Sequence, residues 1–150
     1  MRKRKKECGN RMRLCLPAIS VNEGIARAAV AAFCAQCDPD ATELADIKCA
    51  VSEAVTNCIV HAYRERSGEI YITVRLISGG VRISVRDRGC GIEDVKRARE
   101  PLFTTDAAGE RSGMGFTVME SFMDKLSVRS AKGRGTLVIL TKYLGRSRES

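Results

Sequence analysis

The clearest hydrophobic pattern in the chain lies between residues 40 and 63. Its apolar positions recur at helical spacing and form one stripe: Leu44, Ile47, Val51, Val55, Cys58 and Ala62. Asp40, followed three residues later by Glu43, is a capping-box pattern that predicts where this helix begins. Glu53 and Asn57 lie on a different face, because each helical residue advances by about 100°. A carboxylate and an amide one turn apart on a mostly apolar helix predict either a solvated face or a functional edge.

Two strands with alternating apolar and polar residues follow this helix. Residues 70–77 and 81–86 each have one apolar face, and the Ser-Gly-Gly turn between them predicts a hairpin. In both strands arginines occupy polar positions of the alternation. Such strands are typical of an antiparallel sheet that is covered on one side only.

The remaining pattern predicts two more helices and three more strands. We expect a strand within residues 12–20, and a helix over 23–37 that Asn22 caps and Asp38-Pro39 ends. We expect a third helix over 116–126 and a last hairpin formed by 126–130 and 136–144. The expected fold is therefore an α+β two-layer sandwich, in which a mixed, mostly antiparallel sheet is covered on one face by helices.

The length and the charge distribution of the chain predict its domain organisation. A chain of 150 residues predicts one domain, which we place at 11–144, with a basic tail at 1–10 and a second tail at 145–150. Of the formal charge of +8, residues 1–6 carry +5 and residues 146–150 carry +1, which leaves +2 for the rest. Because this excess is mostly in the tails, we expect no direct nucleic-acid partner. No apolar run of about 18 residues is present, so we also expect no membrane span.

The seven cysteines do not form a metal or redox pattern. Cys34 and Cys37 make a C-x-x-C pair, but no second pair at zinc spacing accompanies it. We expect Cys34, Cys49 and Cys58, which lie among Ala and Val, to act as small apolar residues. An odd number of thiols favours a reducing, cytoplasmic environment.

Two glycine-containing segments are candidates for ligand chemistry. Asp87 follows the second strand of the first hairpin and precedes Gly89 and Gly91. A carboxylate at a strand end can accept a hydrogen bond from an exocyclic amine, and glycine lets the backbone approach a flat ligand. Taken alone, this D-x-G-x-G pattern favours an ordinary turn, because Asp and Gly are common turn residues.

The second segment, RSGMGFT at 111–117, opens the predicted third helix. Backbone N–H groups at a helix N-terminus attract phosphate, although a flexible N-cap has the same composition. The long connection between the two segments includes PLFTT at 101–105 and has glycines at 109 and 113. Its length inside a small domain predicts a lid. Near phosphate, Asn57 would suit Mg²⁺ and Glu53 would suit a general base.

These motifs, in this order, resemble the Bergerat-type ATP-binding fold of the GHKL superfamily, which includes gyrase B and sensor histidine kinases. Within it, VSEAVTNCIVHAY, VRDRGCGI, PLFTT and ERSGMGFTVMESFMD closely resemble the anti-sigma factor serine kinases of spore-forming bacteria. The resemblance covers residues 20–144. One departure is Ala62, at a position where such proteins often have Gly.

The resemblance implies ATP and Mg²⁺ as cofactors and a role for each motif residue. Glu53 would be the catalytic base for a serine hydroxyl, and Asn57 would coordinate Mg²⁺. Asp87 and Thr136 would bind adenine, with Gly89 and Gly91 shaping the pocket. The lid and phosphate residues would be Thr104, Thr105, Ser112, Gly113, Met114, Gly115 and Phe116. Arg111 is a candidate for contact with partner proteins.

The resemblance also implies a function and partners. We expect a protein serine kinase and anti-sigma factor that inhibits a sporulation sigma factor and phosphorylates a serine of an anti-anti-sigma protein. A general stress-response circuit, or an ATP-gated sigma-binding module with negligible kinase activity, remain alternatives. The resemblance implies a homodimer, to which an opening strand at a sheet edge adds support. The sporulation interpretation places the protein in the forespore cytoplasm.

Overall fold

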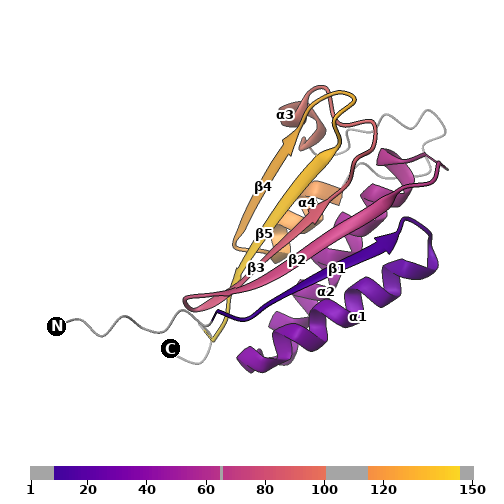
Figure 1. Ribbon diagram of the computed structural model, residues 1–150. Helices are drawn as coiled ribbons and strands as arrows, with labels where there is room; N and C mark the ends of the chain where they lie inside the picture. Colours follow the sequence, from indigo (N-terminus) through magenta and orange to yellow (C-terminus); the bar gives the residue numbers. More distant parts are fainter. Residues whose placement is uncertain (1–8, 65, 101–114, 146–150) are drawn as a thin grey trace.

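The computed structural model describes residues 9–64, 66–100 and 115–145, which form a sheet with helices on one face (Figure 1). The strands are β1 (Arg11–Pro17), β2 (Glu69–Ile77), β3 (Gly80–Arg86), β4 (Lys125–Ser130) and β5 (Thr136–Tyr143). The helices are α1 (Val21–Cys34), the 3₁₀ turn η1 (Ala35–Cys37), α2 (Ala41–Asn57), the π-helix η2 (Cys58–Ala62), α3 (Val95–Ala98) and α4 (Gly115–Phe122).

The sheet has the strand order β1-β2-β3-β5-β4, and each neighbouring pair is antiparallel. The expected α+β sandwich with helices on one face is confirmed, and all the described pairings are antiparallel rather than mixed. α2 packs between α1 and α4. The residues of its apolar stripe that are most deeply buried, Ile47, Val51 and Val55, are inaccessible to solvent. They pack with the inward residues of β2 and β3 in one core.

α2 begins as the sequence predicts. The Asp40 side chain accepts from the backbone N–H of Glu43 at 2.7 Å, and the Glu43 side chain accepts from the N–H of Asp40 at 2.9 Å. This reciprocal pair satisfies backbone donors that the first turn would otherwise leave exposed. The other Glu43 oxygen accepts from the N–H of Gly145 at 2.8 Å, so the cap also fixes the chain beyond β5.

The prediction for the start of α1 is wrong. The helix begins at Val21, and Asn22 lies inside its first turn, where it is buried. Its side-chain amide donates to the carbonyl of Pro17 at 2.9 Å, so it joins the helix to the end of β1 and does not cap it. The helix also ends earlier than expected, at Cys34, and the 3₁₀ turn η1 completes the segment before Asp38, which has a left-handed φ of 52°.

Two further expectations need correction. α4 ends at Phe122 and not at residue 126, because Leu126 pairs with Leu140 in the β4–β5 ladder and Asp124 accepts from the N–H of Tyr143 at 2.7 Å. Cys49 is exposed, whereas Cys34 and Cys58 are buried as expected. Across the described ranges, no helix is both long enough and apolar enough to span a bilayer.

Candidate functional site

Glu53 and Asn57 lie at the edge of α2 that faces the start of α4. Both are half-buried, so the fully solvated face is not what the structure shows. A Cβ atom added at Gly115 would lie 3.3 Å from Oδ1 of Asn57 and 3.4 Å from Oε2 of Glu53. The absence of a side chain at Gly115 therefore leaves room beside a carboxylate and an amide oxygen. Within the described ranges, neither polar side chain has a hydrogen-bond partner.

Immediately after Asn57 the helix widens into the π-helix η2, which hydropathy did not predict. A π turn inside an α-helix is rare and is frequent at functional sites. It presents the carbonyl of Ala62 to the loop after β3, where the N–H of Cys90 donates to it at 2.9 Å. A Cβ at Gly89 would collide with this same carbonyl and would lie 2.6 Å from Cβ of Ala62. Because Gly89 has no side chain, alanine is accommodated at position 62.

Asp87 is the buried carboxylate of the site, with a side chain that retains 4% exposure. Its Oδ1 accepts from the backbone N–H groups of Gly89 at 2.9 Å and Thr136 at 3.2 Å, and its Oδ2 accepts from the thiol of Cys58 at 3.6 Å. Burial raises the pKa of Asp87 above its usual value, while the three donors act in the opposite direction. Cys58 follows Asn57 directly, so this contact links the polar edge of α2 to the carboxylate.

The glycines around Asp87 let three segments of the backbone approach one another. Gly91 has φ of +72°, and a Cβ there would collide with the carbonyl of Ala131. Gly135 has φ of +82°, and a Cβ there would collide with the carbonyl of Asp87. At both glycines, the missing side chain makes room for another part of the chain. These contacts fix the position of Asp87 itself.

Hydroxyl groups of Thr136, Ser130 and Tyr63 form further hydrogen bonds around Asp87 and the loop that follows it. Thr136 pairs with Asp87 through its backbone, since its carbonyl accepts from the N–H of Asp87 at 3.0 Å. The hydroxyls of Thr136 and Ser130 are 2.8 Å apart, and Ser130 also accepts from the N–H of Ile92 at 2.7 Å. Tyr63 donates to the carbonyl of Glu69 at 2.6 Å and accepts from the N–H of Arg88 at 2.8 Å.

Sequence reasoning missed three residues that hold the site together: Cys58, Tyr63 and Ser130. The sequence pattern places Cys58 in the apolar stripe, and its burial in the core obscures its polar contact with Asp87. The other two act through contacts 5 to 38 residues away in sequence, as Ser130 does with Gly135 and Ile92. A single sequence carries no local signal for such pairings.

The structure brings together only part of the predicted set. Glu53, Asn57 and Gly115 form one group, and Asp87, Gly89, Gly91 and Thr136 form the other. Phe116 is half-buried and packs against the core. The remaining predicted residues lie outside the described ranges: Thr104, Thr105, Arg111, Ser112, Gly113 and Met114.

The donor set fits a nucleotide with a hard cation. A buried carboxylate can receive an amino group of a base, and an amide oxygen beside a carboxylate suits Mg²⁺, which takes few protein ligands when phosphate supplies others. Within the described residues, no three His, Cys, Asp or Glu side chains gather into an all-protein metal cluster.

Comparisons with known proteins agree with this chemistry. The model of a family described as the histidine kinase-like ATPase domain matches residues 17–142. The chain is 56% identical over 142 residues to the anti-sigma F factor of Caldanaerobacter subterraneus subsp. tengcongensis, covering 95% of this chain and 99% of that protein. It is 51% identical over 140 residues to the anti-sigma F factor of Bacillus subtilis, covering 93% and 96% of the two chains.

Two solved structures are also similar. The structure of the RsbU and RsbW domains of Rv1364c from Mycobacterium tuberculosis aligns with a TM-score of 0.67 at 26% identity, covering 91% of this chain and 33% of that one. The catalytic domain of the histidine kinase ThkA aligns with a TM-score of 0.53 at 26% identity, covering 67% and 68%. Both matches support the ATPase-domain fold.

Proposed function

Because the chain belongs to the histidine kinase-like ATPase domain family and, within it, to the anti-sigma F factors, we propose that it is an ATP-dependent protein serine kinase and anti-sigma factor of sporulation. One observation carries the kinase part of this proposal. Glu53 and Asn57 are half-buried side by side at Gly115, and Cys58, the residue after Asn57, contacts the buried carboxylate of Asp87. We infer from this that a general base, a metal ligand and an adenine-binding carboxylate belong to one nucleotide site.

The residues divide into two ends of a nucleotide site. Asp87, supported by Thr136, would accept from the adenine amino group, while Oδ1 of Asn57 would coordinate Mg²⁺. When bound, ATP and Mg²⁺ would supply the phosphoryl group and the positive charge that neutralises its oxygens. The residues Thr104, Thr105, Ser112, Gly113 and Met114 are proposed to enclose the phosphates with Gly115 and Phe116.

Glu53 would act on the acceptor. Its carboxylate would take the proton of the partner's serine hydroxyl, the serine oxygen would gain the phosphoryl group, and ADP would leave. Positioning and charge neutralisation dominate the rate of such transfers, and a well-placed base contributes about 10²–10⁴-fold. A pure binding module has no need for a half-buried carboxylate at this position.

We propose two protein partners. One is a sporulation sigma factor, which the chain would bind and inhibit in the forespore cytoplasm, and the other is an anti-anti-sigma protein, which it would phosphorylate on serine. Arg111 is proposed to contact these partners. The names and high identity of the relatives support the sigma-factor partner.

The test is phosphotransfer from labelled ATP to the anti-anti-sigma protein of the same organism. We expect the wild-type chain to label it. Glu53→Gln should retain nucleotide binding but lose about 100-fold or more of the transfer rate, because only proton removal is impaired. Asn57→Ala should lose Mg²⁺-dependent nucleotide binding. Thr56→Ala is the matched control on the same helix, since its hydroxyl donates to the carbonyl of Ser52 at 2.7 Å within the helix itself.

Survival of transfer in both Glu53→Gln and Asn57→Ala would overturn the proposed mechanism. A wild-type chain that captures the sigma factor only with ATP, yet labels no antagonist, would instead favour the gated binding module. Identification of the captured sigma factor by mass spectrometry separates sporulation from the general stress response.

We further propose a homodimer formed through the edge of the sheet at β1. β1 is an outer strand of the described sheet, and an unpaired edge invites pairing with another chain. Just beyond its end, Ile19, Val21 and Ile25 are 52%, 67% and 49% exposed. These exposed apolar side chains follow β1 closely in the sequence and support an interface there.

A further inference from the structure

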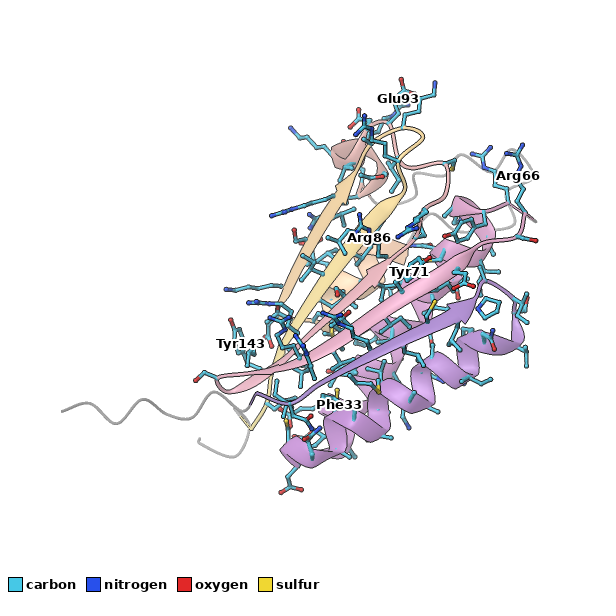
Figure 2. The ribbon with its side chains drawn as sticks, in the orientation of Figure 1. Phe33, Arg66, Tyr71, Arg86, Glu93 and Tyr143 are labelled. Atoms are coloured by element: carbon cyan, nitrogen blue, oxygen red, sulfur yellow. The ribbon has the colours of Figure 1, made fainter. Side chains whose placement is uncertain are left out.

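The face of the sheet that the helices leave open is strongly basic. Four cationic side chains fall in one row across the strands, because Arg11 pairs with Arg75, Arg75 with Arg82, and both Arg82 and Lys125 with Thr141. Arg13, Arg86, Arg88 and Arg129 extend the surface, and all of these Lys and Arg side chains are exposed. In Figure 2, Arg86 and Tyr71 lie over the strands, whereas Phe33 lies on α1.

Described carboxylates do not balance the charge of this face. Glu69 is the one carboxylate that the described strands place on it, and its carboxylate contacts the thiol of Cys15. The ion pairs formed between described residues, such as Lys142–Asp46 at 3.0 Å, include none of these cations. Like charges directly opposite in neighbouring strands destabilise a sheet. Arg11, Arg75 and Arg82 are such neighbours, so the fold retains an unfavourable row that a bound anion would stabilise.

The face is also hollowed in two places. One hollow of about 460 Å³ is lined by residues that include Arg13, Arg86, Arg88 and Leu137. The lining of a second, of about 500 Å³, includes Arg82, Lys125 and Ile139. Each hollow therefore combines cations with an aliphatic side chain. Such a combination suits a carboxylate with an apolar side chain beside it.

Other occupants fit this surface less well. A second copy would bring an identical basic face, which this face would repel. The N-terminal residues 1–6 would be repelled as well, because their charged side chains are all positive. Single-stranded nucleic acid needs open aromatic rings for its bases. Here Arg88 lies over the ring of Tyr71 at 4.9 Å, and Lys125 lies over that of Tyr143 at 5.8 Å. We propose that the open sheet face is a docking surface for an acidic protein segment in which apolar residues are spaced among carboxylates.

This surface is distinct from the nucleotide site, and its use does not require phosphotransfer. The probe is a fluorescein-labelled peptide with Leu spaced among Glu, titrated with the full chain at physiological salt. The double variant Arg82→Glu/Arg86→Glu should weaken binding about tenfold or more, because each change replaces an attraction with a repulsion. Lys48→Glu/Lys96→Glu is the matched control, since both lysines are exposed on helices. Asn57→Ala should bind the peptide like wild type.

Further arms separate the other occupants. A peptide with Ser in place of Leu should bind less tightly if the hollows receive apolar side chains. Equal binding of the two peptides would contradict the proposal, because charge attraction alone would then explain the affinity. Preference for a single-stranded oligodeoxynucleotide over the peptide would overturn the proposal in favour of nucleic acid. Self-association that Arg82→Glu/Arg86→Glu abolishes would overturn it in favour of a second copy.

Discussion

At the scale of single residues, Gly91 and Gly133 have nearly the same φ angle but different surroundings. Their φ angles are +72° and +77°, yet a Cβ at Gly91 would collide with the carbonyl of Ala131, whereas one at Gly133 would meet nothing within 4 Å. Gly133→Ala should lower the free energy of unfolding by the left-handed backbone penalty alone, about 1–2 kcal/mol. Gly91→Ala should lower it by about 1–3 kcal/mol more, because the overlap is added. Urea unfolding of both variants measures the difference, and equal losses would contradict the packing described for the Asp87 loop.

Asp87 provides a second residue-scale prediction, through pH. Burial raises its pKa above the ordinary 3.8, so the folded chain holds this proton more tightly than the unfolded chain. The contribution of Asp87 to stability is therefore greatest below pH 3.8 and is lost as pH rises through the raised pKa. Asp87→Asn has no such titration. The melting temperature of the variant relative to wild type should rise with pH through that window and then become constant.

The same variant should separate stability from ligand binding. An asparagine retains an oxygen for the N–H groups of Gly89 and Thr136 but has no charge to attract the adenine amino group. We expect nucleotide affinity to fall about tenfold or more at neutral pH, since a hydrogen bond to a charged group is worth about 1.5–3 kcal/mol. Isothermal titration calorimetry at pH 7 measures this affinity. An unchanged affinity would show that Asp87 does not bind adenine.

At the scale of elements, the sequence predicted those whose signal is local. The capping box and apolar stripe of α2 depend on residues within a few turns of each other, and both are confirmed. The strands β2 and β3 follow from simple alternation. The end of α4 is different. Leu126 continues a helical apolar pattern, but in the structure it lies in β4 and pairs with Leu140 of β5. Hydropathy cannot show whether such a residue extends the helix or pairs in the sheet.

The π-helix η2 is another limit of local pattern. Its side chains were expected to continue the stripe of α2, and Cys58 does remain buried. What this pattern does not show is the long-range contact of η2, where the carbonyl of Ala62 accepts from the N–H of Cys90 in the loop after β3. The candidate polar residues Glu53, Asn57 and Asp87 were thus identifiable from spacing and chemical type. The contacts that hold them, through Cys58, Tyr63 and Ser130, are long-range and were not.

At the scale of the whole molecule, summing charge along the chain concealed its distribution in space. The net charge of +2 between the tails suggested a nearly neutral body. The fold places arginines from separate strands on one face, while carboxylates such as Asp46 and Glu53 lie on the helical layer. Alternation in each strand showed the polar positions, but only the strand order β1-β2-β3-β5-β4 shows that they form one surface.

The proposed dimer gives the last prediction, and it is compatible with the basic face. Pairing through the β1 edges would set two open faces side by side and would not press them together. Val21→Glu places a charge on the most exposed apolar residue next to that edge and should shift the chain toward monomer. Val60→Glu is the matched control, because Val60 is 40% exposed on η2. Sedimentation velocity at micromolar concentration with nucleotide measures both, and a monomeric wild-type chain, or equal effects of the two variants, would contradict the proposed interface.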